Sequence, residues 1–196
     1  MAIGLLGGSF NPAHEAHRLI SLTALKRLGL SRVWWLVSPG NPLKSHADLA
    51  PLDVRVSHAR RMADHPLIEV TAYEAALGTS YTAETLRVLK ARRPGVRFVW
   101  LMGGDNLAGF HRWRDWQRIF ELMPIAVADR PSWRFKALAS PAAMRFGRYR
   151  MPEREARRLP LAQPPAWVYL SWRLSHISST LLRAQANAKE KGKPLP

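Results

Sequence analysis

Apolar residues along this chain alternate between short unbroken runs and longer stretches with a helical period. The short runs predict strands at residues 3–6, 32–37, 67–72, 96–102, 125–128 and 166–172. Between them, apolar positions that recur every three or four residues predict helices at 14–28, 52–64, 82–90 and 116–123. Gly29 directly follows the first helix and fits a C-cap. Repeated strand–helix units favour a parallel sheet with right-handed crossovers.

The length of 196 residues is enough for one substantial core, so a single domain over residues 1–188 is expected, with a flexible tail at 189–196. Residues 131–165 are rich in proline and arginine and show no clear period, which predicts an irregular insertion or lid-like segment. The expected fold is therefore α/β, a Rossmann-like open parallel sheet with helices on both faces.

The stretch AIGLLGGSFNPAHEAH at residues 2–17 reads as a strand, a glycine turn and a helix start. In an open α/β sheet, ligands bind beyond the carboxyl end of a strand, where the next helix directs free amide hydrogens at an anion. Gly7 and Gly8 fit this use because a residue without Cβ lets the backbone approach a phosphate. A phosphate is therefore the first ligand expected at this place. The two histidines are expected to lie in a crevice on the surface of the protein rather than in its core.

Two known glycine-loop designs do not fit this stretch. A P-loop needs Gly-Lys followed by Ser or Thr, and residues 11–14 are Asn, Pro, Ala and His. A dinucleotide fingerprint needs three spaced glycines and an acidic residue about 20 positions later, and both are missing.

The net charge of +16, from 30 Lys and Arg against 14 Asp and Glu, implies an anionic partner without saying which kind. The absence of cysteine excludes disulfides and thiolate metal sites. The longest apolar runs are strand-sized and the start of the chain lacks a basic leader, so a cytoplasmic protein is expected.

The residues 7–17, GGSFNPAHEAH, resemble the T/HxGH signature of the nucleotidylyltransferase superfamily, usually written GG(S/T)FDPxHxGH. His14 and His17 match its histidines, while Asn11 stands where Asp is usual and Ala16 where Gly is usual. Near the other end, residues 176–183, HISSTLLR, resemble the ISSTxxR signature of the same superfamily. A Ser-Ser-Thr helix start offers hydroxyls and free amides to phosphate oxygens, and Arg183 follows one turn later.

The middle of the chain indicates which branch of the nucleotidylyltransferase superfamily it resembles. The segments SYTAETL at 80–86, GGDNL at 103–107 and FHRW at 110–113, with Arg130–Pro131, look like those of bacterial nicotinate mononucleotide adenylyltransferases. In the loop at 39–51, Leu43 stands where that family commonly has His, and Lys44 follows it.

This resemblance implies adenylyl transfer from ATP to nicotinate mononucleotide in NAD biosynthesis, with Mg²⁺ carried by ATP and no metal held by the protein. It assigns catalysis to His14, His17 and Arg183, and ATP binding to these three with Gly7, Gly8, Ser9, Phe10, Ser178, Ser179 and Thr180. It assigns the nucleotide substrate to Lys44, Tyr81, Thr82, Gly104, Asp105, Trp113 and Arg130. The Trp113 indole is expected to stack on the nicotinate ring.

Several alternatives stay open. Two histidines three residues apart share a helix face, but the known helical zinc signature spaces them by four. Phosphopantetheine adenylyltransferases share both terminal motifs, without counterparts for SYTAETL and FHRW. A nucleic-acid-binding module would explain the charge and the basic aromatic run at 112–118, but it leaves both phosphate motifs unexplained. Neither nucleic acid nor a membrane is expected as a partner, and the oligomeric state is undetermined.

Overall fold

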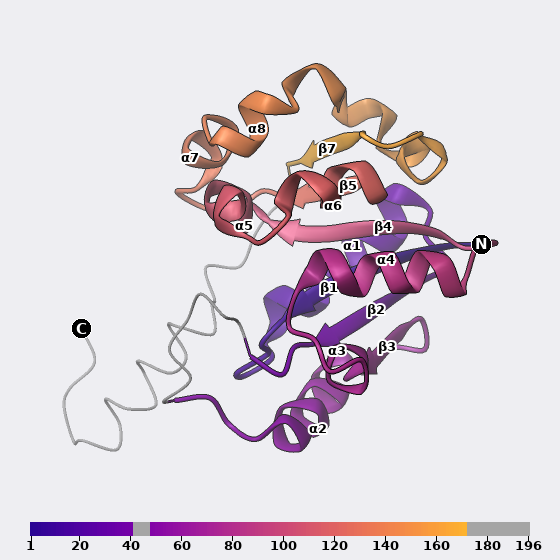
Figure 1. Cartoon of the computed structure of the whole chain (residues 1–196), viewed down its shortest axis with the longest axis vertical. Helices are drawn as coiled ribbons and strands as arrows, with labels where there is room; N and C mark the ends of the chain where they lie inside the picture. The colour runs from indigo at the N-terminus through magenta and orange to yellow at the C-terminus, as the bar shows by residue number, and fades with distance from the viewer. Residues whose placement is uncertain (41–47, 172–196) are drawn as a thin grey trace.

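The computed structural model describes residues 1–40 and 48–171, and these form a seven-stranded sheet in which every strand pair is parallel (Figure 1). Its strands run in the spatial order β3-β2-β1-β4-β5-β7-β6. The bounds are β1 Ala2–Gly8, β2 Arg32–Val37, β3 Ile68–Thr71, β4 Arg97–Gly103, β5 Ile125–Ala128, β6 Arg150–Met151 and β7 Trp167–Leu170. The predicted α/β class and parallel sheet are therefore confirmed.

Helices connect successive strands. The longer ones are α1 Glu15–Leu28, α2 Leu52–Ala63, α4 Thr82–Arg92 and α6 Trp116–Leu122. The shorter ones are α3 Tyr73–Ala76, α5 Gly104–Gly109, α7 Arg134–Leu138 and α8 Pro141–Arg145, with 3₁₀ helices η1 Phe110–Arg112, η2 Gly147–Tyr149 and η3 Glu153–Leu161. In this part of the chain no helix is both long and apolar enough to cross a bilayer.

Two hydrophobic clusters lie on opposite faces of the sheet, as the alternation of side chains along a strand requires. In β1, Ile3 and Leu5 belong to the cluster that buries apolar residues of α4, α5, α6 and α8. Leu6 belongs to the other cluster, which buries residues of α1, α2 and η3. Helices therefore cover both faces, as predicted, with α4 and α6 on the face turned to the viewer in Figure 1.

The chain order reverses between β1 and β4. From β1 the chain continues outward to β2 and β3, and it then returns to place β4 on the other side of β1. Leu5 is consequently paired with Trp34 of β2 and with Trp100 of β4. The switch point of this sheet therefore lies beside the end of β1, where residues 9–14 of the GGSFNPAHEAH signature, here called the signature loop, begin.

The structure differs from the sequence-based prediction in two places. Gly7 and Gly8 belong to β1, paired with Leu36 and Val37, so the turn begins only at Ser9. Residues 131–165, expected to be irregular, contain α7, α8, η2, β6 and η3, and they contribute buried residues to both clusters. Gly29 caps α1 as predicted, with a φ of 66°.

Candidate functional site

Among the described residues assigned to the site, one group lies beyond the carboxyl ends of β1, β4 and β5, which are neighbours in the sheet. The signature loop follows β1, Gly104 and Asp105 follow β4, and Arg130 comes two residues after β5 ends. Side chains from widely separated parts of the sequence are thereby brought to one edge of the sheet.

Gly7 sits at this edge for a packing reason. A Cβ placed there would lie 2.3 Å from Cη2 of Trp100, a fully buried ring on β4. The Trp100 ring in turn meets Trp113 edge-on, with ring centroids 6.5 Å apart. The glycine at the end of β1 and the tryptophan of FHRW are therefore linked through one buried indole.

The turn after β1 is fixed by Phe10, whose φ of 47° lies in the left-handed region. Its ring is buried and stacks on Trp35 of β2 at 5.0 Å between centroids. The same ring lies 4.7 Å from that of His17. The Phe10 side chain thus packs between Trp35 and His17, and only the backbone of Phe10 is left to contact a ligand.

His14 is the N-cap of α1, and His17 lies in its first turn. The two imidazole rings are 3.9 Å apart, and the backbone N–H of His14 donates to Nδ1 of His17 at 3.2 Å. This bond needs a lone pair on Nδ1, so the proton of a neutral His17 sits on Nε2. The expected exposed position is wrong for His14, which is only 3% exposed and whose ring packs against that of His17.

Both histidines are held in the neutral form at pH 7. Burial, together with the nearby Arg130 guanidinium, lowers the pKa of His14 to about 4. Burial also lowers the pKa of His17 well below its ordinary value, with His14 and Arg130 acting in the same direction. The pair therefore offers hydrogen-bond donors rather than positive charge, and the charge is supplied by Arg130.

Arg130 forms an ion pair with Asp105, with Nη1 and Oδ2 2.8 Å apart. The pair bridges the segments that follow β5 and β4, and both side chains are mostly buried. A Cβ at Gly103 would lie 2.4 Å from Oδ1 of Asp105, and one at Gly104 would lie 3.1 Å from the Tyr169 hydroxyl. The two glycines therefore make room for the carboxylate and for a phenol.

Trp113 and the start of α4 form the other half of the site. Trp113 is half-buried and packs on Phe110, with 5.0 Å between centroids. Tyr81 is the N-cap of α4, Thr82 is its first residue, and the Arg114 guanidinium lies 4.5 Å from the centre of the Tyr81 ring. This stacking ties the turn that carries Trp113 to the amino end of α4.

The comparison with protein families decides the relationship. The model of the family described as cytidylyltransferase-like matches residues 5–185. The chain belongs to the cytidylyltransferase-like family.

Among cytidylyltransferase-like proteins, the chain is similar to curated bacterial relatives. It is 56% identical over 183 residues to a protein of Bradyrhizobium sp. (strain BTAi1 / ATCC BAA-1182), covering 93% of this chain and 95% of the relative. It is 52% identical over 184 residues to one of Rhizobium meliloti (strain 1021), covering 94% and 98%. Both relatives are named probable nicotinate-nucleotide adenylyltransferase, so the resemblance inferred from the motifs is confirmed.

Solved structures of this fold include the Plasmodium falciparum nicotinic acid mononucleotide adenylyltransferase complexed with NaAD. It matches with a TM-score of 0.70 at 17% identity, over 93% of this chain and 82% of that one. The same enzyme complexed with APC matches with a TM-score of 0.61 at 16% identity, over the same shares. At this identity the likeness supports the cytidylyltransferase-like fold alone.

Five predicted site residues lie outside the described residues: Lys44, Ser178, Ser179, Thr180 and Arg183. Within residues 1–40 and 48–171, no group of three or more His, Asp or Glu side chains is placed to hold a metal ion.

Sequence reasoning missed Arg55 of α2, which ties together the loops beside the site. Its guanidinium donates to the carbonyls of Ser9, Ser38, Pro39 and Ala50 at 2.7–3.1 Å, and the residue is 2% exposed. Asn11 adds a second link, donating to the Asp48 carbonyl at 2.7 Å. Arg55 could have been singled out, because it precedes the buried Ala59 by four residues and so shares its helix face.

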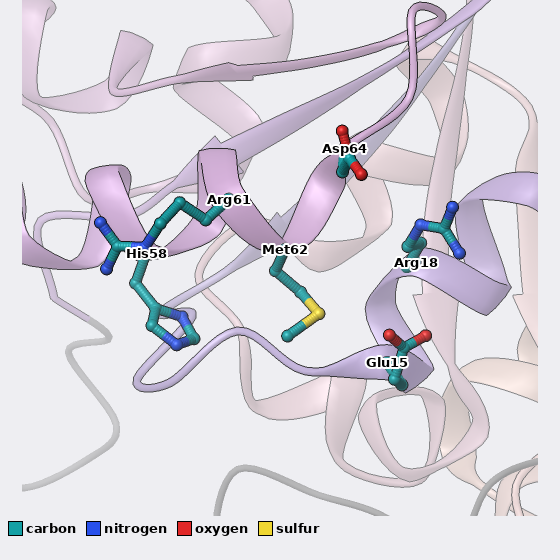
Figure 2. A pocket seen from close by; sticks show the side chains of 6 residues that line it. All are labelled: Glu15, Arg18, His58, Arg61, Met62 and Asp64. Carbon is teal, nitrogen blue, oxygen red and sulfur yellow. The ribbon is translucent and has the colours of Figure 1, made fainter.

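A surface hollow of about 400 Å³ lies between α1 and α2 (Figure 2). It is lined by Glu15, Arg18, His58, Arg61, Met62 and Asp64, none of which was predicted as a site residue. It is open to solvent, and its side chains carry both signs of charge. Nothing about it points to a particular ligand.

Proposed function

We propose that this chain transfers the adenylyl group of ATP to nicotinate mononucleotide. A phosphate oxygen of the mononucleotide attacks the α-phosphorus of ATP, and the bond from that phosphorus to the β-phosphate bridging oxygen breaks. The products are nicotinate adenine dinucleotide and pyrophosphate. No protein nucleophile is required, so the protein must align two polyanions and stabilise the charge that develops on their oxygens.

One observation carries the proposal: the GGSFNPAHEAH loop lies at the switch point of the sheet, with its histidine pair close to Arg130. The two curated relatives cover nearly the whole chain and are named for this reaction, which supports the same conclusion.

His17 is proposed to donate a hydrogen bond from its Nε2–H to a phosphate oxygen of ATP. Because its Nδ1 accepts from the His14 amide, the ring is held in one tautomer and one orientation before the nucleotide binds. A neutral donor gains most as the oxygen becomes more negative, so its effect falls on the transition state.

Arg130 is proposed to supply the fixed positive charge for a substrate phosphate, with Asp105 limiting where its guanidinium can go. Lys44, Arg183 and the Ser178–Thr180 hydroxyls are expected to contact other phosphates, and Gly7, Gly8 and Ser9 to offer backbone amides. Mg²⁺ carried by ATP would neutralise charge on the leaving pyrophosphate.

The test is a pyrophosphate-release assay with ATP, Mg²⁺ and each of three acceptors: nicotinate mononucleotide, nicotinamide mononucleotide and phosphopantetheine. We expect turnover with the first, and His17→Ala serves as the inactive control. Turnover with phosphopantetheine alone would place the chain in another branch of the superfamily. No turnover with any acceptor would refute the proposal.

A cytoplasmic location, and the absence of a nucleic-acid or membrane partner, stay predictions from the sequence. A salt titration of RNA binding, run beside the enzyme assay, tests the nucleic-acid alternative. Tight, salt-sensitive RNA binding without pyrophosphate release would favour that class.

A further inference from the structure

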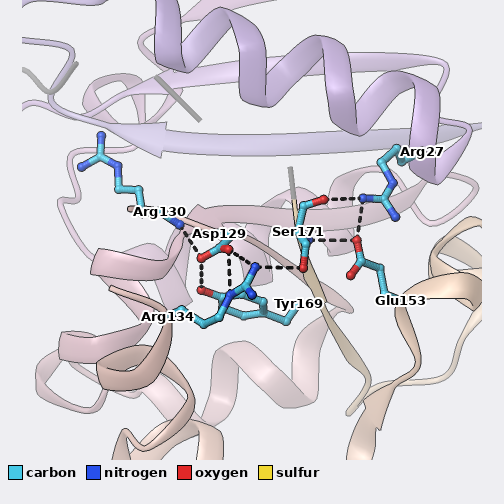
Figure 3. A network of polar contacts seen from close by, with 7 residues as sticks. All are labelled: Arg27, Asp129, Arg130, Arg134, Glu153, Tyr169 and Ser171. Carbon is cyan, nitrogen blue, oxygen red and sulfur yellow. Dashed lines mark hydrogen bonds and ion pairs between the residues drawn. The ribbon is translucent and has the colours of Figure 1, made fainter. Parts of the chain in front are cut away.

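Asp129, the first residue after β5, accepts hydrogen bonds from three other residues (Figure 3). Its Oδ1 accepts from the backbone N–H of Arg130 at 2.8 Å and from the hydroxyl of Tyr169 at 2.7 Å. Its Oδ2 accepts from Nε of Arg134 at 2.8 Å and also from Nη2 of the same guanidinium. The residue is only 9% exposed, so its charge depends on these donors.

The carboxylate joins three elements. Arg134 comes from α7 and Tyr169 from β7, and the backbone N–H of Asp129 donates to the Leu170 carbonyl at 2.9 Å. Burial and the bond to Asp129 raise the pKa of the Tyr169 phenol, so this group remains a donor at any physiological pH. Arg134 also reaches the Ser171 hydroxyl at 3.2 Å.

These bonds fix the main chain of Arg130 on both sides. Its N–H is held by Oδ1 of Asp129, and its carbonyl accepts from the N–H of Trp133 at 3.0 Å. Its guanidinium extends away from the Asp129 cluster, as Figure 3 shows, and meets Asp105. The main chain of Arg130 is therefore held by one bond to Asp129 and one from Trp133.

We infer that Asp129 is a positioning residue, which aims Arg130 at the substrate phosphates by holding the Arg130 amide with Oδ1. This inference rests on the proposed function, because it assigns a role within that site. Its two oxygens have separable tasks: Oδ1 orients Arg130, and Oδ2 binds Arg134 and stabilises the fold.

This division predicts different outcomes for three variants. Asp129→Ala removes both acceptors and should lower kcat/KM by about 10²-fold, the size of loss that a misplacement of about 1 Å in a site can cause. Arg134→Gln breaks the Oδ2 ion pair and the bond to the Ser171 hydroxyl but leaves the bonds of Oδ1, so we expect a lower Tm with kcat/KM within about threefold of wild type. Asp129→Asn keeps an acceptor at Oδ1 and should rescue most of the activity lost in Asp129→Ala, without restoring the Tm.

The experiment measures kcat, KM and Tm for wild type and the three variants, at a temperature well below every Tm. It also measures the Kd of ATP and of nicotinate mononucleotide by calorimetry. Asp129→Ala should weaken binding of at least one nucleotide about tenfold, and Arg134→Gln should not.

Three results would overturn the inference: full activity in Asp129→Ala, an Asp129→Asn variant as impaired as Asp129→Ala, or activity that follows Tm through all three variants. A wild type without turnover would instead refute the proposed function. In that case the calorimetric comparison of the variants with both nucleotides decides the inference.

Discussion

Glu74 gives the most quantitative prediction, because its carboxyl is buried and the proposed chemistry does not use it. It lies in α3, directly after β3, and is 3% exposed. Burial raises the pKa of this carboxyl from 4.5 to about 7. We therefore expect Glu74→Gln, a neutral side chain of the same shape, to stabilise the protein at alkaline pH.

The sign follows from proton binding. The folded state holds the Glu74 proton more tightly than the unfolded state, so the stability from this group is full below pH 4.5 and is lost as the pH rises to about 7. Each pKa unit is worth about 1.36 kcal/mol of folding stability. The stability lost through Glu74 is therefore about 3 kcal/mol above pH 7 and only about 1 kcal/mol at pH 5.

The assay is urea unfolding of wild type and Glu74→Gln between pH 5 and pH 9. The lowered pKa values of His14 and His17 act the other way, reducing stability as the pH falls below 6.5, but they are common to both proteins and cancel in the difference. Glu121→Gln is the matched control, because Glu121 is half exposed and pairs only with Arg118 among the described residues. If the difference in free energy of unfolding between wild type and Glu74→Gln stays constant from pH 5 to pH 9, the reasoning is refuted.

Four further predictions concern the site and its support. His17→Ala should lower kcat by about 10²–10³-fold in a folded protein, as for loss of one preorganised donor, and near wild-type kcat would contradict the assigned role. Arg183→Lys should lower kcat strongly, because an ammonium cannot bind two phosphate oxygens in the bidentate geometry of a guanidinium. Equal activity would mean that Arg183 makes no bidentate contact. Arg55→Met should lower the free energy of unfolding by about 3 kcal/mol or more, since it removes the donor from four partly buried carbonyls, and a change below about 1 kcal/mol in urea unfolding would count against this. The ratio of kcat/KM for nicotinate over nicotinamide mononucleotide should be about 10² or more in wild type, and Trp113→Ala should lose both substrates about equally. A ratio near one in wild type would overturn the pocket assignment.

The sheet was predictable from sequence because strands buried on both faces read as unbroken apolar runs. The bounds predicted for β2 and β5 agree with the structure for this reason. β6 was missed because two residues, Arg150 and Met151, cannot show a period, and the strand exists only through its pairing with β7. The short helices α3 and α5 escaped prediction in the same way.

The signature residues of the site were predictable because their spacing is local, within residues 7–17. Their supports were not, since Arg55 binds carbonyls 5 to 46 positions away and Asp129 meets Tyr169 40 positions away. No window of sequence contains both ends of such bonds. The burial of His14 was also missed, because burial depends on tertiary packing that the spacing within residues 7–17 does not show.

The position of β1 at the centre of the sheet also constrains how the protein can acquire its structure. Ile3 and Leu5 need β4 as a neighbour, and β4 begins only at Arg97, after three strand–helix units (β1–α1, β2–α2 and β3–α4). A chain that has emerged from the ribosome only as far as Gly95 would carry a central strand with one unpaired, apolar edge, which is the kind of surface on which chains aggregate or chaperones act. Folding of this protein is therefore expected to be a late, all-or-none event rather than a sequential one, and no fragment that ends before β4 should be stable alone.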